Sequence, residues 1–157
     1  VRFIGLDCEK DMIQKAQRKC AQMKTVEFLE ADLLDYEFEK SDLIISYYSM
    51  QFIPARNRQI LFDAIYESLN WGGGLILFEK VRAPDAHFQD MMTTIYTDFK
   101  LDQGYTSEEI VSKTRSLKGV LEPFSTAGNI DLLKRAGFQD IMSIMKYVCF
   151  EGFLAIK

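Results

Sequence analysis

Two acidic side chains stand where a carboxylate could bind a nucleoside. Asp7 ends the apolar run Val1-Arg2-Phe3-Ile4-Gly5-Leu6, and Asp32 follows the alternating run 26–31. An acid at the carboxyl end of a buried strand in an α/β sheet is well placed to accept hydrogen bonds from ribose hydroxyls. We therefore predict that Asp7 binds the ribose of a cofactor; the alternative is that Asp7 caps the helix that begins near Glu9.

A second group of candidate side chains follows a continuous apolar run. Residues 42–46 lead into Tyr47 and Tyr48, and Gln51 comes just after them. Such a run is typical of a strand buried on both faces. We expect Tyr47, Tyr48 and Gln51 to lie near the bound molecules; the alternative is that the two tyrosines are ordinary core residues.

The residue types that ligate metals form no cluster. The cysteines at positions 8, 20 and 149 make no C-x-x-C motif, and the single His87 has no partner at helical spacing. These spacings predict a reduced compartment and no zinc site. They identify no catalytic nucleophile, so the catalytic residues stay unknown at this point.

Length and charge narrow the class of protein. A chain of 157 residues with 48% hydrophobic residues can build one sizeable core, and we predict a single domain over residues 1–157. The net charge of −4 argues against broad nucleic-acid binding, and no apolar run approaches 18 residues. We expect a soluble, cytoplasmic protein that binds a small-molecule substrate and neither nucleic acid nor membrane; a homodimer is left open.

Strand and helix patterns alternate along most of the chain. The spacing of apolar residues predicts strands near 1–7, 26–31, 42–48 and 75–80, with helices over 9–23, 55–69 and 129–136 and a closing hairpin over 139–157. The segment Asn70-Trp71-Gly72-Gly73-Gly74 is expected to stop the second helix. This alternation predicts a mainly parallel α/β sheet with helices on both faces.

Residues 82–122 break that alternation. Two helices are predicted there, over 85–101 and 107–121, the second beginning with a capping box at Thr106 or Ser107. A helical insertion between two strands of such a sheet is usually a lid over the ligand crevice. We expect this insert to be more mobile without ligand than the sheet.

The glycine-rich turn of a nucleotide-binding unit is not found. That turn and its strand lie about 20 residues before the ribose acid, whereas the chain starts six residues before Asp7. We therefore expect a fragment that lacks the first strand and the glycine-rich loop. In that case the strands 1–7 and 42–48 would not be hydrogen-bonded neighbours.

The order of these pieces resembles a known family. Ile4-Gly5-Leu6-Asp7, Gln51-Phe52, Glu79-Lys80, Asp98-Phe99-Lys100 and Gly104-Tyr105 stand in an order and spacing similar to class I S-adenosylmethionine-dependent methyltransferases. Within that Rossmann-like fold the closest likeness is to the carboxy-S-adenosylmethionine synthases of bacterial tRNA wobble-uridine modification. The resemblance covers nearly the whole chain.

The resemblance implies roles for individual residues. The cofactor would be S-adenosyl-L-methionine, or its product S-adenosyl-L-homocysteine or carboxy-S-adenosyl-L-methionine. Asp7 would hold its ribose, Cys8 would lie beside the adenine, Asp32 would accept from the adenine amino group, and the backbone of Leu33 would lie under the ring. Tyr47 stands where the synthases have an asparagine.

One departure from the family bears on the reaction. The synthases use an arginine in the helical insert to bind the extra carboxylate of their product, and Thr114 stands at that position, with Arg115 next to it. A threonine hydroxyl cannot replace a bidentate, charge-assisted clamp. The sequence therefore favours methyl transfer to an unidentified acceptor, with Tyr48, Gln51, Tyr105, Thr114 and Arg115 around it.

Three alternatives remain open. The first is synthesis of carboxy-S-adenosylmethionine from S-adenosylmethionine and prephenate. The second is a cofactor-binding homologue without catalysis. The third, a nicotinamide dehydrogenase, is the weakest, because the helical insert and the closing hairpin do not belong to that pattern.

Overall fold

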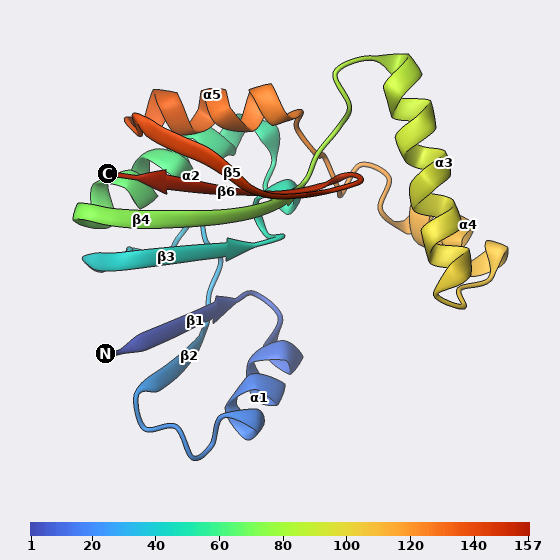
Figure 1. The fold of residues 1–157 in the computed structure, drawn as a ribbon. Helices are drawn as coiled ribbons and strands as arrows, with labels where there is room; N and C mark the ends of the chain where they lie inside the picture. The colour runs from blue at the N-terminus through green and yellow to red at the C-terminus, as the bar shows by residue number, and fades with distance from the viewer. The chain divides into compact units, whose positions relative to one another are not determined.

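The computed structural model describes all residues from 1 to 157, and they form two compact units, Val1–Phe38 and Glu39–Lys157 (Figure 1). The first unit consists of β1 (Phe3–Asp7), α1 (Lys10–Lys19) and β2 (Val26–Glu30). β1 and β2 are parallel and run in register from Phe3 with Val26 to Asp7 with Glu30. This unit is the predicted strand–helix–strand.

The helix α1 buries one narrow stripe, with Ile13 as its only buried side chain. It ends at Lys19, earlier than the predicted residue 23, and the Cys20 amide bonds back to the carbonyl of Ala16. Beneath the helix, Gly5 leaves room for the ring of Phe28: a Cβ at Gly5 would lie 2.6 Å from that ring. The ring of Phe28 can lie over the β1 backbone because position 5 carries no side chain.

The second unit contains a four-stranded sheet in the order β3-β4-β6-β5. Its elements are β3 (Ser41–Tyr47), the 3-10 turn η1 (Met50–Phe52), α2 (Ala55–Ser68), β4 (Leu69–Lys80), α3 (Ala86–Asp102), α4 (Ser107–Ser116), α5 (Thr126–Ala136), β5 (Asp140–Tyr147) and β6 (Phe150–Ile156). β3 and β4 are parallel, whereas β6 is antiparallel to both β4 and β5. The pairing is therefore mixed, and the predicted closing hairpin is confirmed.

The core of this unit lies between the sheet and two helices, α2 and α5, which lie on the same side of the sheet (Figure 1). Leu75 and Leu77 alternate toward that side of β4 and are fully buried, as are Phe62 of α2 and Leu133 of α5. Burying such side chains is the main source of stability for a layered fold. After α5, Gly137 adopts a positive φ of 118°, the predicted helix stop.

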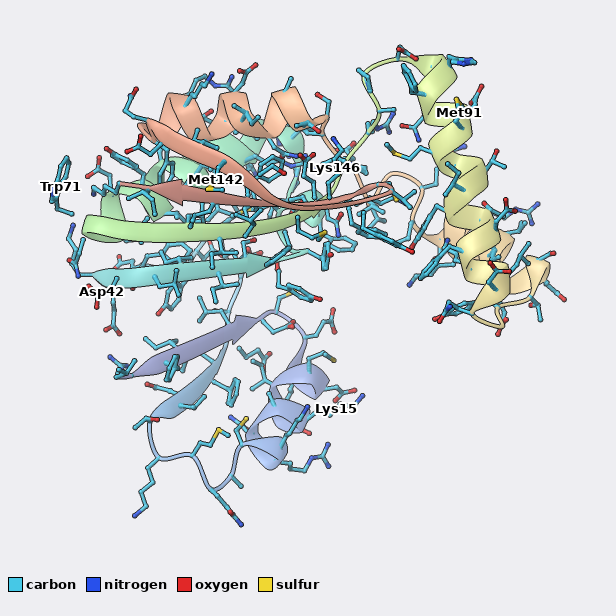
Figure 2. The ribbon with its side chains drawn as sticks, viewed as in Figure 1. Lys15, Asp42, Trp71, Met91, Met142 and Lys146 are labelled. Carbon is cyan, nitrogen blue, oxygen red and sulfur yellow. The ribbon has the colours of Figure 1, made fainter.

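The start of β4 differs from the prediction. β4 begins at Leu69 and includes the three glycines, because Leu69 pairs with Ser41 and a register shift follows before Leu43 pairs with Gly74. At Gly73 a Cβ would lie 3.0 Å from the carbonyl oxygen of Asp42, so the missing side chain permits strand pairing where the sequence suggested a break. Trp71 projects from this end of β4 and is 89% exposed (Figure 2).

Helices α3 and α4 form the predicted insert and lie beyond the end of the sheet, near the β5–β6 hairpin (Figure 1). Asp85 caps α3, and Thr106 forms a complete capping box with Glu109 at the start of α4. α4 ends at Ser116 rather than at residue 121. None of the helices combines the length and apolar character needed to cross a membrane.

The strands form two separate sheets, one in each unit. The expectation that strands 3–7 and 41–47 are not hydrogen-bonded neighbours concerns both units and stays a prediction. The expected single domain over residues 1–157 stays a prediction.

Candidate functional site

The first unit places its two acids at one edge. Because β1 and β2 are parallel and Asp7 stands opposite Glu30, the carboxyl ends of both strands lie together, and the Ala31 amide donates to the Asp7 carbonyl. Asp7 is half-buried and Asp32 is exposed. The adjacent Cys8 is exposed and Leu33 is half-buried. All four predicted cofactor residues of this unit thus lie at the carboxyl edge of the β1–β2 pair.

Each acid is oriented by a backbone amide two residues ahead. One Asp7 carboxylate oxygen accepts from the Glu9 amide at 2.8 Å, and one Asp32 oxygen accepts from the Leu34 amide at 2.9 Å. An ionised carboxylate can accept about four hydrogen bonds, so each acid keeps capacity for ribose hydroxyls or an amino group. The first turn of α1 has Glu9 as its N-cap with no side-chain cap bond. Asp7 therefore stabilises the turn before the helix, and this role is compatible with ribose binding.

In the second unit, the end of β3 has a strained backbone. Tyr48 has a φ of 58°, a value that bulky residues rarely adopt. Its amide donates to the Phe78 carbonyl, and its ring contacts the rings of Tyr47 and Phe150. Strained residues often cluster at functional sites. Tyr47 is 67% exposed, so it is not the core residue of the alternative interpretation, and its cofactor role stays a prediction.

A buried polar network holds the loop after Tyr48. The Gln51 amide accepts from the Lys80 backbone at 3.1 Å through its oxygen and donates to the Tyr48 carbonyl at 3.0 Å through its nitrogen. Arg58, almost fully buried, donates to the carbonyls of Ile53 and Gln51. Both ends of the Gln51 amide bond to backbone, so its geometry favours positioning Tyr48 over contact with a substrate.

Glu79, the second-last residue of β4, lies within the same network. It is 2% exposed and accepts from the Met50 amide at 3.1 Å. Burial raises the pKa of Glu79 to about 8, against the opposing effects of the Met50 amide and the Arg58 guanidinium. The same burial lowers the pKa of Arg58. Glu79 is therefore largely a neutral acid at pH 7.

An aromatic cluster with two cations lies where the helical insert meets the sheet. The Tyr96 ring of α3 stands over Phe150 at 5.3 Å between centroids. The ammonium nitrogens of Lys80 and Lys100 lie 4.7 and 4.2 Å from the centre of that same ring. Such distances are typical of cation–π contacts.

Electrostatic coupling adds further members to this cluster. Burial raises the pKa of Tyr96, and interactions with Cys149, Tyr105 and Tyr48 raise it further. Burial also raises the pKa of Cys149, whereas the nearby lysines lower it. The structure therefore brings the predicted Tyr48 and Tyr105 into one neighbourhood. The sequence interpretation missed Glu79, Lys80, Tyr96 and Lys100 as site residues, although Glu79-Lys80 and Lys100 stood within the motifs of the family resemblance.

Thr114 and Arg115 lie on α4, and neither contacts this cluster. The Thr114 hydroxyl donates to the Ile110 carbonyl at 2.8 Å, within its own helix. Ile110 is buried, but Thr114, one turn further along α4, is exposed. Arg115 is exposed as well. Their substrate roles stay predictions.

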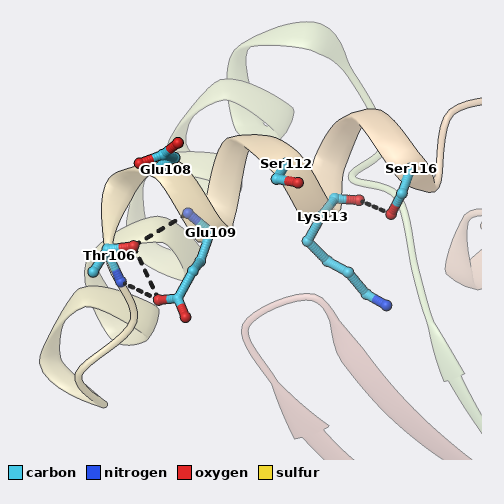
Figure 3. A pocket seen from close by; sticks show the side chains of 6 residues that line it. All are labelled: Thr106, Glu108, Glu109, Ser112, Lys113 and Ser116. Carbon is cyan, nitrogen blue, oxygen red and sulfur yellow. Dashed lines mark hydrogen bonds between the residues drawn. The ribbon is translucent and has the colours of Figure 1, made fainter.

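A hollow of about 460 Å³ lies along one face of α4 (Figure 3). Its lining is a single polar helix face made by Thr106, Glu108, Glu109, Ser112, Lys113 and Ser116. The hydrogen bonds drawn there close the capping box and the last helical turn. Because it lacks an apolar wall and convergent unpaired groups, we do not regard this hollow as the ligand site. No group of three or more His, Cys, Asp or Glu side chains could hold a metal ion.

Known proteins are similar to this chain in sequence and in fold. The methyltransferase domain family matches residues 1–73. A carboxy-S-adenosyl-L-methionine synthase of Campylobacter lari is 39% identical over 100% of this chain and 68% of its own length. A synthase of the same name from Helicobacter hepaticus is 41% identical over 99% of this chain and 66% of its own.

The solved structure of human N-acetylserotonin methyltransferase in complex with SAM shares the fold, with a TM-score of 0.61. The two sequences are 17% identical, and the match covers 99% of this chain and 39% of that chain. The chain thus spans about two thirds of the curated relatives and less than half of this solved structure. Together these similarities support the predicted α/β class I methyltransferase fold.

Proposed function

Because the chain belongs to the carboxy-S-adenosyl-L-methionine synthase family, whose members are enzymes of the S-adenosylmethionine-dependent methyltransferase type, we propose that the protein makes carboxy-S-adenosyl-L-methionine. The observation that carries this proposal is the 39% identity with a synthase across the full length of the chain. In that reaction the sulfonium methyl carbon of S-adenosyl-L-methionine loses a proton and gains the CO2 that prephenate releases. Prephenate also loses hydroxide and becomes phenylpyruvate, so the proton and the hydroxide leave together as water. Its product would serve tRNA wobble-uridine modification, as the family resemblance implies.

The first unit would bind the nucleoside part of S-adenosyl-L-methionine. The half-buried Asp7 carboxylate would accept from the ribose hydroxyls, and Asp32 from the adenine amino group. Cys8 and the Leu33 backbone would line the adenine. The backbone bonds that orient both acids support this assignment, because preorganised acceptors lose little entropy when the ligand binds.

The second unit would hold the carboxylate donor. Tyr48 and Tyr105 lie near Tyr96, and they provide hydroxyl donors and aromatic surface for a small organic acid such as prephenate. Gln51 and Glu79 would position Tyr48 through the loop that they hold. The enzyme would work mainly by orientation, which can be worth about 7 kcal/mol or more in favourable cases.

Methyl transfer to another acceptor is the second candidate, and Thr114 favours it. Its hydroxyl is bonded to Ile110, so it offers no charged clamp for a carboxylate at the family's arginine position. In this case Thr114 and the exposed Arg115 would lie around the methyl acceptor.

A product assay separates the two candidates. The protein is incubated with S-adenosyl-L-methionine and prephenate, and mass spectrometry looks for the carboxylated cofactor. Its appearance only when prephenate is added would support the proposal. If no carboxylated cofactor forms while added nucleophiles are methylated, the second candidate replaces it; if neither product forms, the homologue binds the cofactor without catalysis.

Cofactor binding is tested separately from turnover. Asp7→Ala should weaken S-adenosyl-L-homocysteine binding by roughly 1 to 3 kcal/mol in isothermal titration, because the ribose hydroxyls lose their acceptor. Asp11→Ala, in the exposed first turn of α1, is the matched control. Equal affinity of the Asp7 variant and the control would reject the ribose role.

A further inference from the structure

Lys80 and Lys100 hold two positive charges close together around one aromatic ring. Lys80 ends β4 and Lys100 belongs to the last turn of α3, yet both ammonium nitrogens lie within cation–π distance of Tyr96. Both side chains are half-buried. A lysine normally extends its ammonium group into water. Two ammonium groups held near one ring repel each other, so a bound anion between them would be stabilising.

No carboxylate of the chain neutralises this pair. Neither lysine takes part in an ion pair, and the carboxylate of Glu79 is turned into the buried network, where it accepts from Met50. The pKa of Lys100 is lowered by burial and by the charge of Lys80. The neighbouring Tyr96 and Cys149 have raised pKa values and so stay neutral at pH 7. The pair is an uncompensated positive site.

We infer that Lys80 and Lys100, with the Tyr96 ring between the sheet and the insert, form a subsite for a carboxylate of the second substrate. The inference rests on the proposed function, and it names residues that would bind the carboxylate donor of that reaction. A carboxylate bound there would relieve the repulsion between the two ammonium groups, and charge-assisted hydrogen bonds to lysine are stronger than neutral ones.

The surroundings favour a carboxylate attached to a ring or another flat apolar body. Phe150 packs edge-on against Tyr96, and Phe99 packs against Tyr147 of the hairpin at 5.8 Å between centroids. Phe99 and Tyr147 remain partly exposed, so their ring surface is open to a ligand. Inorganic phosphate would use the charges but not the rings. An aromatic carboxylate would use both.

Titration with phenylpyruvate, in the presence of S-adenosyl-L-homocysteine, tests this subsite without turnover. Lys80→Met and Lys100→Met should each weaken binding by roughly tenfold or more, the loss expected for one charge-assisted hydrogen bond. Lys80→Arg and Lys100→Arg should retain most of the affinity. Lys113→Met, on the exposed face of α4, is the matched control and should bind as wild type. Thermal unfolding of each variant verifies that it is folded.

Three comparisons would overturn the inference. The first is equal phenylpyruvate affinity in wild type and both methionine variants. The second is equal binding of phenylpyruvate and its uncharged methyl ester. The third is binding of inorganic phosphate as tight as that of phenylpyruvate, which would reduce the subsite to a general anion site without aromatic selectivity.

The kinetic result distinguishes this inference from the proposed function. If wild type makes carboxy-S-adenosyl-L-methionine and the KM for prephenate is unchanged in both methionine variants, the subsite is wrong and the function stands. If wild type makes none, yet phenylpyruvate binding depends on both lysines, the function is wrong and the subsite stands.

Discussion

The sheet layer and the helical insert of the second unit are built in opposite ways. Between the sheet and helices α2 and α5, side chains such as Phe62, Leu75 and Phe153 are completely buried. Helix α3 has half-buried but no fully buried side chains, and Ile110 is the only buried side chain of α4. Met91 of α3, for example, is 48% exposed (Figure 2). Elements with few buried contacts open at low free-energy cost, so the insert is the natural moving part.

The insert is also anchored in a way that suits a hinge. Arg82, before α3, forms an isolated parallel bridge with Ser125, just before α5, and the Arg82 amide donates to the Phe124 carbonyl. Its two ends are thus joined at one point of the sheet layer. Between them, contact with the hairpin is made through aromatic pairs such as Tyr96 with Phe150. We expect the insert to open by separating these aromatic contacts and the contact of Lys80 with Tyr96, on the microsecond-to-millisecond scale typical of lids.

The largest effect should follow from a change in the sheet layer. Phe62→Ala removes a fully buried ring and should lower the free energy of unfolding by about 3–5 kcal/mol, because the cavity cannot refill completely. Phe88→Ala, on α3 at 54% exposure, makes the same chemical change in the insert and should cost much less. Urea unfolding of both variants measures the contrast. Equal losses would mean that the insert is as firmly packed as the layer.

The next effect concerns the buried acid that joins β4 to the loop after β3. The pKa of Glu79 is raised to about 8 from an ordinary value of 4.5. Its contribution to stability is therefore complete below pH 4.5 and is lost as pH rises toward 8, since the unfolded state releases the proton first. Glu79→Gln should remove this decline, which these two pKa values put at about 3 to 4 kcal/mol between pH 5 and 8.

Urea unfolding of wild type and variant at several pH values measures that decline. Glu67→Gln, on the exposed side of α2, is the matched control and should leave the wild-type pH dependence in place. A wild-type stability that is constant from pH 5 to 8 would mean that Glu79 is ionised in the folded protein and paired with Arg58.

The sequence predicted elements of both the sheet layer and the insert wherever a local pattern encodes them. Strands such as 41–47 and the hairpin are encoded by apolar patterns and turn residues that act locally, and the capping box at Thr106 is a local motif too. The pattern failed at Leu69–Gly74, where pairing with Ser41 overrode the glycines. Tertiary contacts decide such boundaries, and local propensity does not.

The candidate site was predictable only in part. Asp7 and Asp32 follow their strands directly, so their common edge could be foreseen from the parallel pairing. Lys80 and Lys100 are twenty positions apart and meet only because α3 lies against the hairpin. The raised pKa of Glu79 could not be predicted either. It depends on how deeply the carboxyl group is buried, and its position in an apolar strand does not reveal that.

The smallest change tests the insert by itself. Thr106→Ala removes the hydroxyl that accepts from the Glu109 amide and half of the capping box of α4. Losing such a cap costs about 1 kcal/mol of helix stability. Because α4 is attached to the rest of the unit through few buried side chains, this loss should appear as faster hydrogen exchange of the amides of residues 107–116. The midpoint of global unfolding should change little.

The matched control is Thr94→Ala on α3, whose hydroxyl only bonds back to the Asp90 carbonyl within its helix, so removing it should leave exchange nearly unchanged.

Exchange measured with and without S-adenosyl-L-homocysteine extends the test from stability to function. Ligand should slow exchange across 82–122 more than across the sheet if the insert closes over the site. Equal protection with and without ligand would mean that the insert is a fixed cover. Unchanged exchange of α4 in the Thr106 variant would mean that packing, and not the cap, stabilises that helix.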